Sequence, residues 1–382
     1  MKPYLQALFA SALLLTACSS TGTAAPAHVM GANVTRTSDV AATKREYFIG
    51  ADEVRWNFAP HGTNDITGQP FDDQAKIYLE SGDRSIGATH TKCLYRGYTD
   101  GSFSSPTPVR AADGPLGILG PVIRAQVGDT IVVHFRNSCA FSASIHAHGV
   151  FYGKDAEGAE YQDNTSGSTK DDDAVAVGGS YTYNWQVPER AGPAAMDVSS
   201  VMWMYHSHVD EIRDTNTGLM GPIVVTAKGK ARHDGSPIDV DQEEFALFTV
   251  TNENQSKYLD HDRAALPKPP AERPFDSDDE ESNLMHTING YVYGNGPMFS
   301  MKVGQRVRWY LMSMGTEVDL HTPHWHGNTA VANGMRTDTV ALMPATMVTA
   351  DMTADNAGIW MFHCHVNDHI TAGMIARYEV IR

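Results

Sequence analysis

Hydrophobic and polar residues alternate along several short stretches of the chain, and glycine and proline separate these stretches. Examples are Thr130 to Phe135, Thr182 to Val187 and Arg306 to Leu311. Alternation with a period of two turns one face of a strand toward a core and the other toward solvent. Long stretches with helical periodicity are hard to find. We therefore expect an all-β protein, built from antiparallel strands in two Greek-key β-sandwiches.

The two halves of the chain carry the same motifs in the same order. A strand signal at Val127–Ile131 has a counterpart at Val303–Val307. In each half there follow a His-x-His pair with a trailing glycine and then a second His-x-His pair after a Trp-Met-aromatic stretch. The matching pairs are His146 and His148 with His324 and His326, and His206 and His208 with His363 and His365. An internal repeat of this kind indicates two domains of one fold.

Composition between the motifs sets the expected boundaries. Ser, Thr, Ala and Gly near the N-terminus indicate a flexible tether, and Gly, Pro and charges between the halves indicate a linker. The polar insertion Gly153 to Asp173 is interpreted as a surface loop. The expected segments are a signal peptide at 1–17, a tether at 18–45, a first domain at 46–227, a linker at 228–243 and a second domain at 244–382.

The first residues are typical of an export signal. Lys2 precedes an apolar run from Leu5 to Leu15, which is too short to cross a bilayer. The run ends in Leu-Thr-Ala followed by Cys18, which resembles a bacterial lipoprotein processing site. We expect Cys18 to be the lipidated first residue of a mature chain that faces the periplasm or the cell exterior, with an ordinary cleaved signal as the alternative.

Net charge and cysteine content limit the partners and the cysteine roles that the sequence allows. The chain has 29 basic and 45 acidic residues, a formal charge of −16, and no run of Lys or Arg. This balance argues against a nucleic-acid partner. Export implies an oxidising compartment, so the four cysteines can be sorted by their expected roles. With Cys18 lipidated and Cys364 inside a metal motif, Cys93 and Cys139 are left as a plausible disulfide.

The His-x-His pairs are candidate metal ligands. On a strand, both imidazoles of such a pair point to the same face. One pair alone is often a coincidence. Four pairs, two in each domain and at matching positions of a repeat, can instead line one shared cavity that holds metal ions.

A second candidate site surrounds Cys364. The stretch His363-Cys364-His365 is followed by His369 and Met374. A thiolate, an imidazole and a thioether, completed by a second His, supply the ligand set of a blue-copper site. His321 is the best candidate for that second His. Tetrahedral zinc would leave the methionine without a role, and metals that prefer oxygen ligands do not suit soft sulfur.

The position of Cys364 couples the two candidate sites. His363 and His365 project to the opposite face of the strand from the thiolate. An electron accepted at Cys364 thus has a short covalent path to imidazoles that hold a second metal site. We therefore interpret Cys364, His363 and His365 as the catalytic group.

The spacings His-x-His-Gly, His-x-His, His-x-x-His-x-His-Gly and His-Cys-His-x-x-x-His-x-x-x-x-Met resemble the four copper motifs of the multicopper oxidases, from about Gly117 to the C-terminus. The resemblance implies two cupredoxin-like domains, four coppers in each subunit, and one-electron oxidation of a reductant coupled to reduction of dioxygen to water. The implied ligands are His321, Cys364, His369 and Met374 for type 1 copper, His146 and His324 for type 2, and His148, His206, His208, His326, His363 and His365 for the type 3 pair.

The first domain lacks the blue-copper residues. Ser207 stands where the second domain has Cys364, and Ile212 and Thr217 stand where it has His369 and Met374. This asymmetry argues against the copper nitrite reductases, which keep their blue copper in the first domain and lack the full set of eight His.

Three segments look closest to ferroxidases of the ceruloplasmin and hephaestin type: Gly117–Ile123, Asn252–Asp260 and Glu317–Thr322. In those proteins an iron site uses a Glu and a His five residues apart, the Asp before the second blue-copper His, and a Glu from a neighbouring domain. The matching residues are Glu281, His286, Asp368 and Glu317. Carboxylates with imidazole suit Fe²⁺, and they favour Fe³⁺ still more, so Fe²⁺ is the expected reductant.

The sequence alone also allows other functions. Small two-domain laccases share the copper ligands and oxidise phenols, and cuprous copper is another possible reductant. A copper-binding, electron-delivering lipoprotein would fit the blue site but does not need eight His.

The sequence alone also leaves two alternatives for how the chain assembles. In the related six-domain ferroxidases the three-copper cluster lies between the first and last domains, so a two-domain chain is expected to form a homotrimer that shares each cluster between two subunits. Closure within one chain is the alternative.

Overall fold

The computed structural model describes residues 42–267 and 276–382. The expected signal peptide, the lipidated Cys18 and most of the tether lie outside the described residues. The first strand, β1, begins at Lys44, so the last two residues of the expected tether belong to the folded part of the chain.

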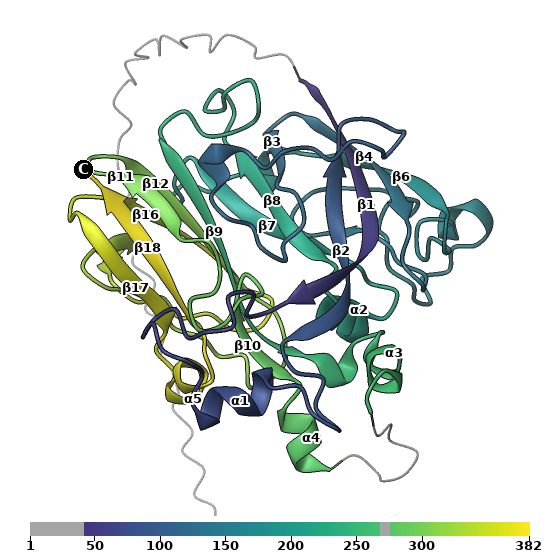
Figure 1. Ribbon diagram of the computed structural model, residues 1–382. Helices are drawn as coiled ribbons and strands as arrows, with labels where there is room; N and C mark the ends of the chain where they lie inside the picture. Colours follow the sequence, from purple (N-terminus) through teal and green to yellow (C-terminus); the bar gives the residue numbers. More distant parts are fainter. Residues whose placement is uncertain (1–41, 268–275) are drawn as a thin grey trace, which may run out of the picture. The chain divides into compact units, whose positions relative to one another are not determined.

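Two four-stranded sheets form the first β-sandwich, with strand orders β2-β1-β4-β6 and β3-β8-β7-β5 (Figure 1). Their inner faces bury a core that includes Phe135, Tyr183 and Trp185. A disulfide joins Cys93 to Cys139, as predicted. The strands are β1 (Lys44–Asn57), β2 (Thr89–Tyr98), β3 (Ile123–Gln126), β4 (Thr130–Asn137), β5 (His146–Ala147), β6 (Ser180–Gln186), β7 (Ser200–His206) and β8 (Met220–Thr226).

The second β-sandwich has a six-stranded sheet, β10-β9-β12-β16-β14-β15, and a four-stranded sheet, β11-β18-β17-β13. Trp309, Trp325 and Phe362 fill its core, and Cys364 and Met374 belong to the same cluster. The strands are β9 (Gln242–Asn252), β10 (Leu284–Ile288), β11 (Phe299–Lys302), β12 (Arg306–Ser313), β13 (Pro323–Trp325), β14 (Ala330–Ala332), β15 (Met335–Thr337), β16 (Met347–Thr353), β17 (Gly358–Cys364) and β18 (Ile375–Ile381).

The expected fold class is confirmed, and the three strands predicted from alternation are present as β4, β6 and β12. The expectation of purely antiparallel pairing is wrong. β1 pairs with β4 in parallel, and so do β3 with β8, β9 with β12 and β11 with β18. Side chains alternate in the same way in both kinds of pair, so the sequence pattern does not separate them.

The two sandwiches pack against each other. An apolar cluster draws Leu119 and Met204 from the first and Phe245 and Tyr310 from the second. The segment expected as a linker takes part in the packing: Ser236 and Val240 are buried within it, and β9 already begins at residue 242.

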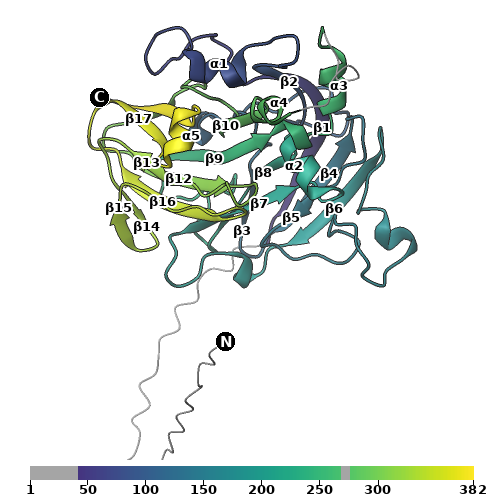
Figure 2. The ribbon, with the colours of Figure 1, turned by 90° about the horizontal axis from the view of Figure 1, so that it is seen from below.

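Short helices lie between the strands, and none of those in residues 42–267 and 276–382 is long and apolar enough to span a bilayer. The segment between β1 and β2 carries α1, which lies close to β10 and α4 in both ribbon views (Figures 1 and 2). The α-helices are α1 (Asp73–Leu79), α2 (Glu211–Thr217), α3 (Leu259–Ala264), α4 (Ser277–Glu281) and α5 (Asn367–Thr371). Four 3₁₀ turns complete the described elements: η1 (Ala111–Asp113), η2 (Gly167–Lys170), η3 (Glu189–Ala191) and η4 (Glu253–Gln255).

Candidate metal centres

Three buried donor atoms converge at the end of β17. Cys364 closes that strand, His369 lies on α5, and His321 lies in the loop before β13. The Cys364 Sγ atom is 3.8 Å from His321 Nδ1 and 3.6 Å from His369 Nδ1, and the two nitrogens are 3.1 Å apart. One soft sulfur and two imidazole nitrogens facing one point form a donor set that copper prefers.

The surroundings of Cys364 favour its ionised form. Burial raises the pKa of the thiol, but hydrogen bonds with His321 and His369 outweigh burial and lower it to about 6. The backbone N–H of Thr322 also donates to the sulfur, at 3.4 Å. A thiolate is the form of cysteine that binds metals. Met374 is fully buried, and its carbonyl accepts from the Cys364 N–H at 3.1 Å.

A buried carboxylate, Asp319, orients His321. Asp319 Oδ1 accepts from His321 Nε2 at 3.2 Å and from the Val250 N–H at 2.7 Å. With Nε2 engaged by the carboxylate, Nδ1 is the ring nitrogen of His321 that faces the sulfur and is available to a metal. The other oxygen of Asp319 packs on Gly315, where a Cβ would lie 2.0 Å away. Sequence reasoning assigned no role to Asp319, although its position two residues before a ligand is a usable signal.

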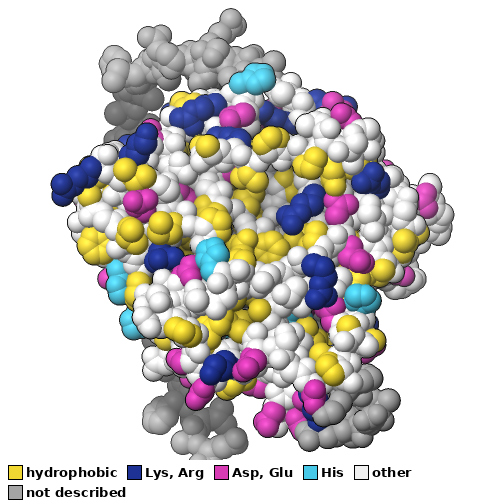
Figure 3. Space-filling model, in the orientation of Figure 1, with side chains coloured by type: hydrophobic (Ala, Val, Ile, Leu, Met, Phe, Trp, Pro, Cys, Tyr) yellow, Lys and Arg dark blue, Asp and Glu magenta, His cyan; other side chains and the backbone are white. Residues whose placement is uncertain are grey.

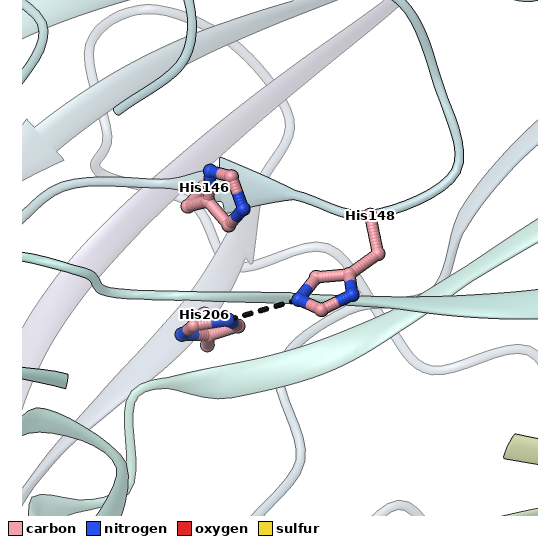
Figure 4. A group of neighbouring side chains, drawn as sticks. All are labelled: His146, His148 and His206. Carbon is pink, nitrogen blue, oxygen red and sulfur yellow. Dashed lines mark hydrogen bonds between the residues drawn. The ribbon is translucent and has the colours of Figure 1, made fainter. Parts of the chain in front are cut away.

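The first sandwich brings its four motif His together. His148 Nε2 lies 3.1 Å from His206 Nε2, and His146 faces both (Figure 4). The His208 ring centroid is 5.1 Å from that of His146. His146 Nδ1 donates to the Glu157 carbonyl at 2.7 Å, which leaves Nε2 free to bind a metal.

Burial favours the neutral form of His148 and His206. Burial lowers the pKa of His206 to about 3 and that of His148 to about 4. A neutral imidazole is the form of histidine that binds a metal ion, so this cluster of ring nitrogens is suited to hold one.

The second sandwich repeats this arrangement. His326 Nε2 lies 3.0 Å and His324 Nδ1 3.3 Å from His363 Nε2. The His365 ring centroid is 5.2 Å from that of His324. His363 Nδ1 donates to the Cys364 carbonyl at 2.8 Å, so its Nε2 is free for a metal.

The two groups of His occupy equivalent positions in the strand pairing of their sandwiches. His146 pairs with His206 between β5 and β7, as His324 pairs with His363 between β13 and β17. Within the described parts of the chain, no hydrogen bond or ring contact joins one group to the other. Each sandwich therefore presents one group of four motif His, half of the eight-His set.

In the first sandwich a hydrogen-bonded network replaces the blue-copper position. Ser207 Oγ donates to the buried Asp214 Oδ2 at 2.6 Å, and Lys257 Nζ lies 3.6 Å from Asp214 Oδ1. Ile212 points to solvent, with 60% of its surface exposed. Thr217 Oγ1 donates to the Arg213 carbonyl at 2.6 Å. A lysine cation and a carboxylate thus occupy the region where the second sandwich has its sulfur and nitrogen donors.

Three of the four expected iron ligands lie beside the Cys364 centre. The His286 ring centroid is 5.4 Å from that of His369, and burial lowers the pKa of His286 to about 4. Glu281 is the last residue of α4 and Asp368 the second residue of α5, and both are exposed. Glu317 lies in an exposed turn, and no contact with the other three is found in the described part of the chain.

Sequence reasoning missed one residue here, Tyr78 of α1. Its hydroxyl donates to Glu281 Oε1 at 2.8 Å, and its ring lies 5.6 Å from that of His286. Burial, and then Glu281, raises the pKa of Tyr78, and Asp368 adds to the effect. The contact with Glu281 bridges 203 residues of sequence, and no local motif marks it.

Comparison with known proteins agrees with this arrangement. Residues 109–230 and residues 265–382 each match a family model described as multicopper oxidase. Human ferroxidase HEPHL1 is 44% identical over 345 residues, and human hephaestin is 43% identical over 343. Human ceruloplasmin is 39% identical over 345 residues.

Those alignments cover 88–89% of this chain but only 29–32% of the relatives, so the chain spans about a third of their length. Among solved structures, one titled as a multicopper oxidase matches with a TM-score of 0.55 at 20% identity, over 89% of this chain and 90% of that one. A blue copper oxidase from Nitrosomonas europaea matches with a TM-score of 0.52 at 18% identity, over 88% and 86%. At this level of identity the structures support the fold alone.

Proposed function

Since the chain belongs to the multicopper oxidases, we propose that it couples one-electron oxidation of Fe²⁺ to the four-electron reduction of dioxygen to water. The observation that carries this proposal is the placement of Cys364. Its sulfur faces two imidazole nitrogens on one side, while His363, its neighbour on the same strand, faces His326 within the His group of the second sandwich.

The donor atoms fit copper. We assign type 1 copper to His321, Cys364, His369 and Met374, type 2 to His146 and His324, and the type 3 pair to His148, His206, His208, His326, His363 and His365. When bound, copper supplies one-electron acceptance from the reductant and the reduction of dioxygen. Four coppers per subunit follow from this ligand count.

The chain itself supplies orientation and a covalent path. Asp319 holds His321 in the tautomer that faces the sulfur, and burial keeps the sulfur away from water. The backbone from Cys364 to His363, with the hydrogen bond from His363 Nδ1 to the Cys364 carbonyl, joins the two kinds of site over one residue.

Iron as the reductant is supported by the acidic residues beside the Cys364 centre. Glu281, His286 and Asp368 offer two carboxylates and one imidazole, and His286 Nδ1 donates to the Leu284 carbonyl at 3.1 Å, which leaves Nε2 for a metal. The His286 ring lies against that of His369, a proposed type 1 ligand. Relatives named ferroxidase agree with this choice.

Substitution of the acidic residues tests the reductant. We expect Glu281→Ala and Asp368→Ala each to raise the KM for Fe²⁺ at least about tenfold, since each removes a ligand that is worth on the order of 1.4 kcal/mol or more. Activity with a phenol or with cuprous copper should change little. Glu280→Ala, an exposed neighbour on α4, is the matched control. Unchanged Fe²⁺ kinetics in both ligand variants would rule out iron as the substrate of this site.

A homotrimer is the assembly that we propose. Each chain presents two separate halves of the eight-His set, and three copies amount to about the length of one relative such as human HEPHL1. Head-to-tail contact between subunits would join the first half of one chain to the second half of the next. The same contact would bring Glu317 of one subunit to the iron site of its neighbour.

We also propose a division into two domains and a location for the protein. One cupredoxin domain precedes the segment 228–243 and one follows it. Export and lipid attachment through Cys18 would hold the protein at a membrane surface outside the cytoplasm.

A further inference from the structure

Tyr78 comes from a part of the chain that is remote in sequence from every proposed metal ligand. It lies on α1, in the segment that joins β1 to β2 of the first sandwich. The residue is 5% exposed and packs in an apolar cluster with Met285, Tyr293 and Ala372 of the second sandwich. The first sandwich thus delivers one fixed side chain to the surface beside the Cys364 centre.

The polar end of Tyr78 meets a proposed iron ligand. Its hydroxyl donates to Glu281 Oε1 at 2.8 Å, and its ring stands edge-on to His286, with 5.6 Å between ring centroids and 67° between planes. A tyrosine hydroxyl facing an ionised carboxylate can only donate. Tyr78 therefore holds one oxygen of Glu281, and within the described residues no hydrogen bond to the other oxygen is found.

Glu281 needs such a partner. It ends α4 and is exposed, so its side chain would otherwise populate several rotamers, and ordering it on metal binding would cost conformational entropy. A hydrogen bond to a buried, immobile donor fixes the carboxylate before the metal arrives, which lowers that cost.

Neighbouring carboxylates differ from Glu281 in this respect. Figure 3 shows acidic side chains on the lower part of the face, over α1 and α4, where Asp72, Asp73, Asp278 and Glu280 are exposed. Such a surface attracts cations in general. Asp72 caps α1 by accepting from the Ala75 N–H, and Asp73 pairs with Lys76. Within the described residues, no tyrosine hydroxyl donates to any of these four, so the contact with a buried tyrosine distinguishes Glu281 from them.

We propose that Tyr78 is a positioning residue for the ferrous substrate, which orients Glu281 so that its free oxygen faces the metal together with His286 and Asp368. This inference rests on the proposed ferroxidase function. It assigns to the α1 segment of the first sandwich a role in substrate binding at a site whose ligands all come from the second.

Tyr78→Phe tests the proposal, because it removes only the hydroxyl and keeps the ring. In the copper-loaded protein we expect the KM for Fe²⁺ to rise about three- to tenfold, with kcat within about twofold of wild type. This is the effect of losing one ordinary hydrogen bond, since Tyr78 acts on the metal only through Glu281. The KM for 2,6-dimethoxyphenol and the visible spectrum of the blue site should not change. The Kd for Mn²⁺, measured by calorimetry, should weaken by the same factor as the KM for Fe²⁺.

Tyr293→Phe is the matched control. It also removes a hydroxyl from the same apolar cluster, but that hydroxyl donates to the Thr371 carbonyl at 3.1 Å and not to an expected ligand. An equal rise in KM for both variants would show a structural effect and would overturn the proposal.

Glu281→Ala distinguishes a failure of the proposed role of Tyr78 from a failure of the proposed ferroxidase function. If Glu281→Ala weakens Fe²⁺ kinetics and Mn²⁺ binding while Tyr78→Phe leaves both unchanged, the role of Tyr78 is disproved and the iron site stands. If Glu281→Ala also has no effect, the ferroxidase proposal fails, and the role of Tyr78 fails with it.

Discussion

At the scale of single residues, the chemistry depends on what surrounds one sulfur atom. Two imidazoles and a backbone N–H approach Cys364, and they keep its pKa low in spite of burial. The equivalent Ser207 in the first sandwich instead donates to Asp214. Two strands of the same repeat thus end in different sites because a few side chains differ.

We predict that Cys364→Ser abolishes the intense thiolate-to-copper absorption and lowers Fe²⁺ oxidation by at least about a hundredfold, since no thiolate remains to bind the metal. Visible spectroscopy and oxygen uptake measure the two effects. Ser207→Cys is the reciprocal control and should produce no second blue band, because residues 212 and 217 supply no ligand. Retention of the colour in Cys364→Ser would contradict the assignment.

Asp319→Asn is predicted to weaken copper binding at the blue site about 10- to 100-fold, a typical cost of altering a group that orients a metal-binding His. The amide oxygen can still accept from the Val250 N–H, so the fold should persist. Titration of the blue absorption against a copper chelator measures the affinity. Asp338→Asn, at an exposed carboxylate 3.6 Å from His324, is the control and should not change it.

At the scale of elements, the sequence predicts what depends on local spacing. Alternation located β4, β6 and β12, and the His-x-His spacing correctly implied imidazoles on a common face, as in His146 with His148. Parallel pairing of β1 with β4 could not be predicted, since it depends on chain connections and not on side-chain period.

Contacts between elements that are distant in the sequence could not be predicted from it either. Tyr78 meets Glu281 across 203 residues, and Asp319 meets the Val250 N–H across 69. These contacts form when strands and helices that are distant in the sequence pack together. No single segment of the sequence indicates which elements will pack against each other. The candidate copper ligands were predictable because each lies in a short motif; the residues that orient them were not.

Strand β9 carries an acid whose ionisation opposes folding. Glu244 is fully buried beside Gly114, and burial raises its pKa from 4.5 to about 8. The folded protein therefore keeps a proton that the unfolded chain releases between those pH values, and the free energy of unfolding falls as pH rises from about 4.5 to about 8.

Glu244→Gln should reduce this dependence, because an amide does not titrate. We predict that the loss of thermal stability between pH 5 and pH 8 becomes smaller by several degrees, at roughly 2–4 °C for each kcal/mol. Thermal unfolding at both pH values, followed by circular dichroism, measures it. The exposed Glu80→Gln serves as the control. An equal pH dependence in Glu244→Gln and wild type would exclude the neutral buried acid.

At the scale of the whole molecule, the proposed homotrimer joins the two groups of His across a contact between subunits. We predict that His148→Ala and His326→Ala, each inactive alone, regain activity when they assemble together. Equal mixing should restore about one quarter of wild-type oxygen uptake, because one interface in four then joins an intact first half to an intact second half. Absence of any recovery in mixed assemblies of confirmed composition would favour closure within one chain.

The most direct test of the central claim is the ratio of Fe²⁺ oxidised to dioxygen consumed by the purified, copper-loaded protein, with hydrogen peroxide measured in the same sample. Electron balance for reduction to water predicts four ferrous ions per dioxygen and no peroxide. A ratio of two with accumulating peroxide, or oxidation that continues unchanged in Cys364→Ser, would contradict the account.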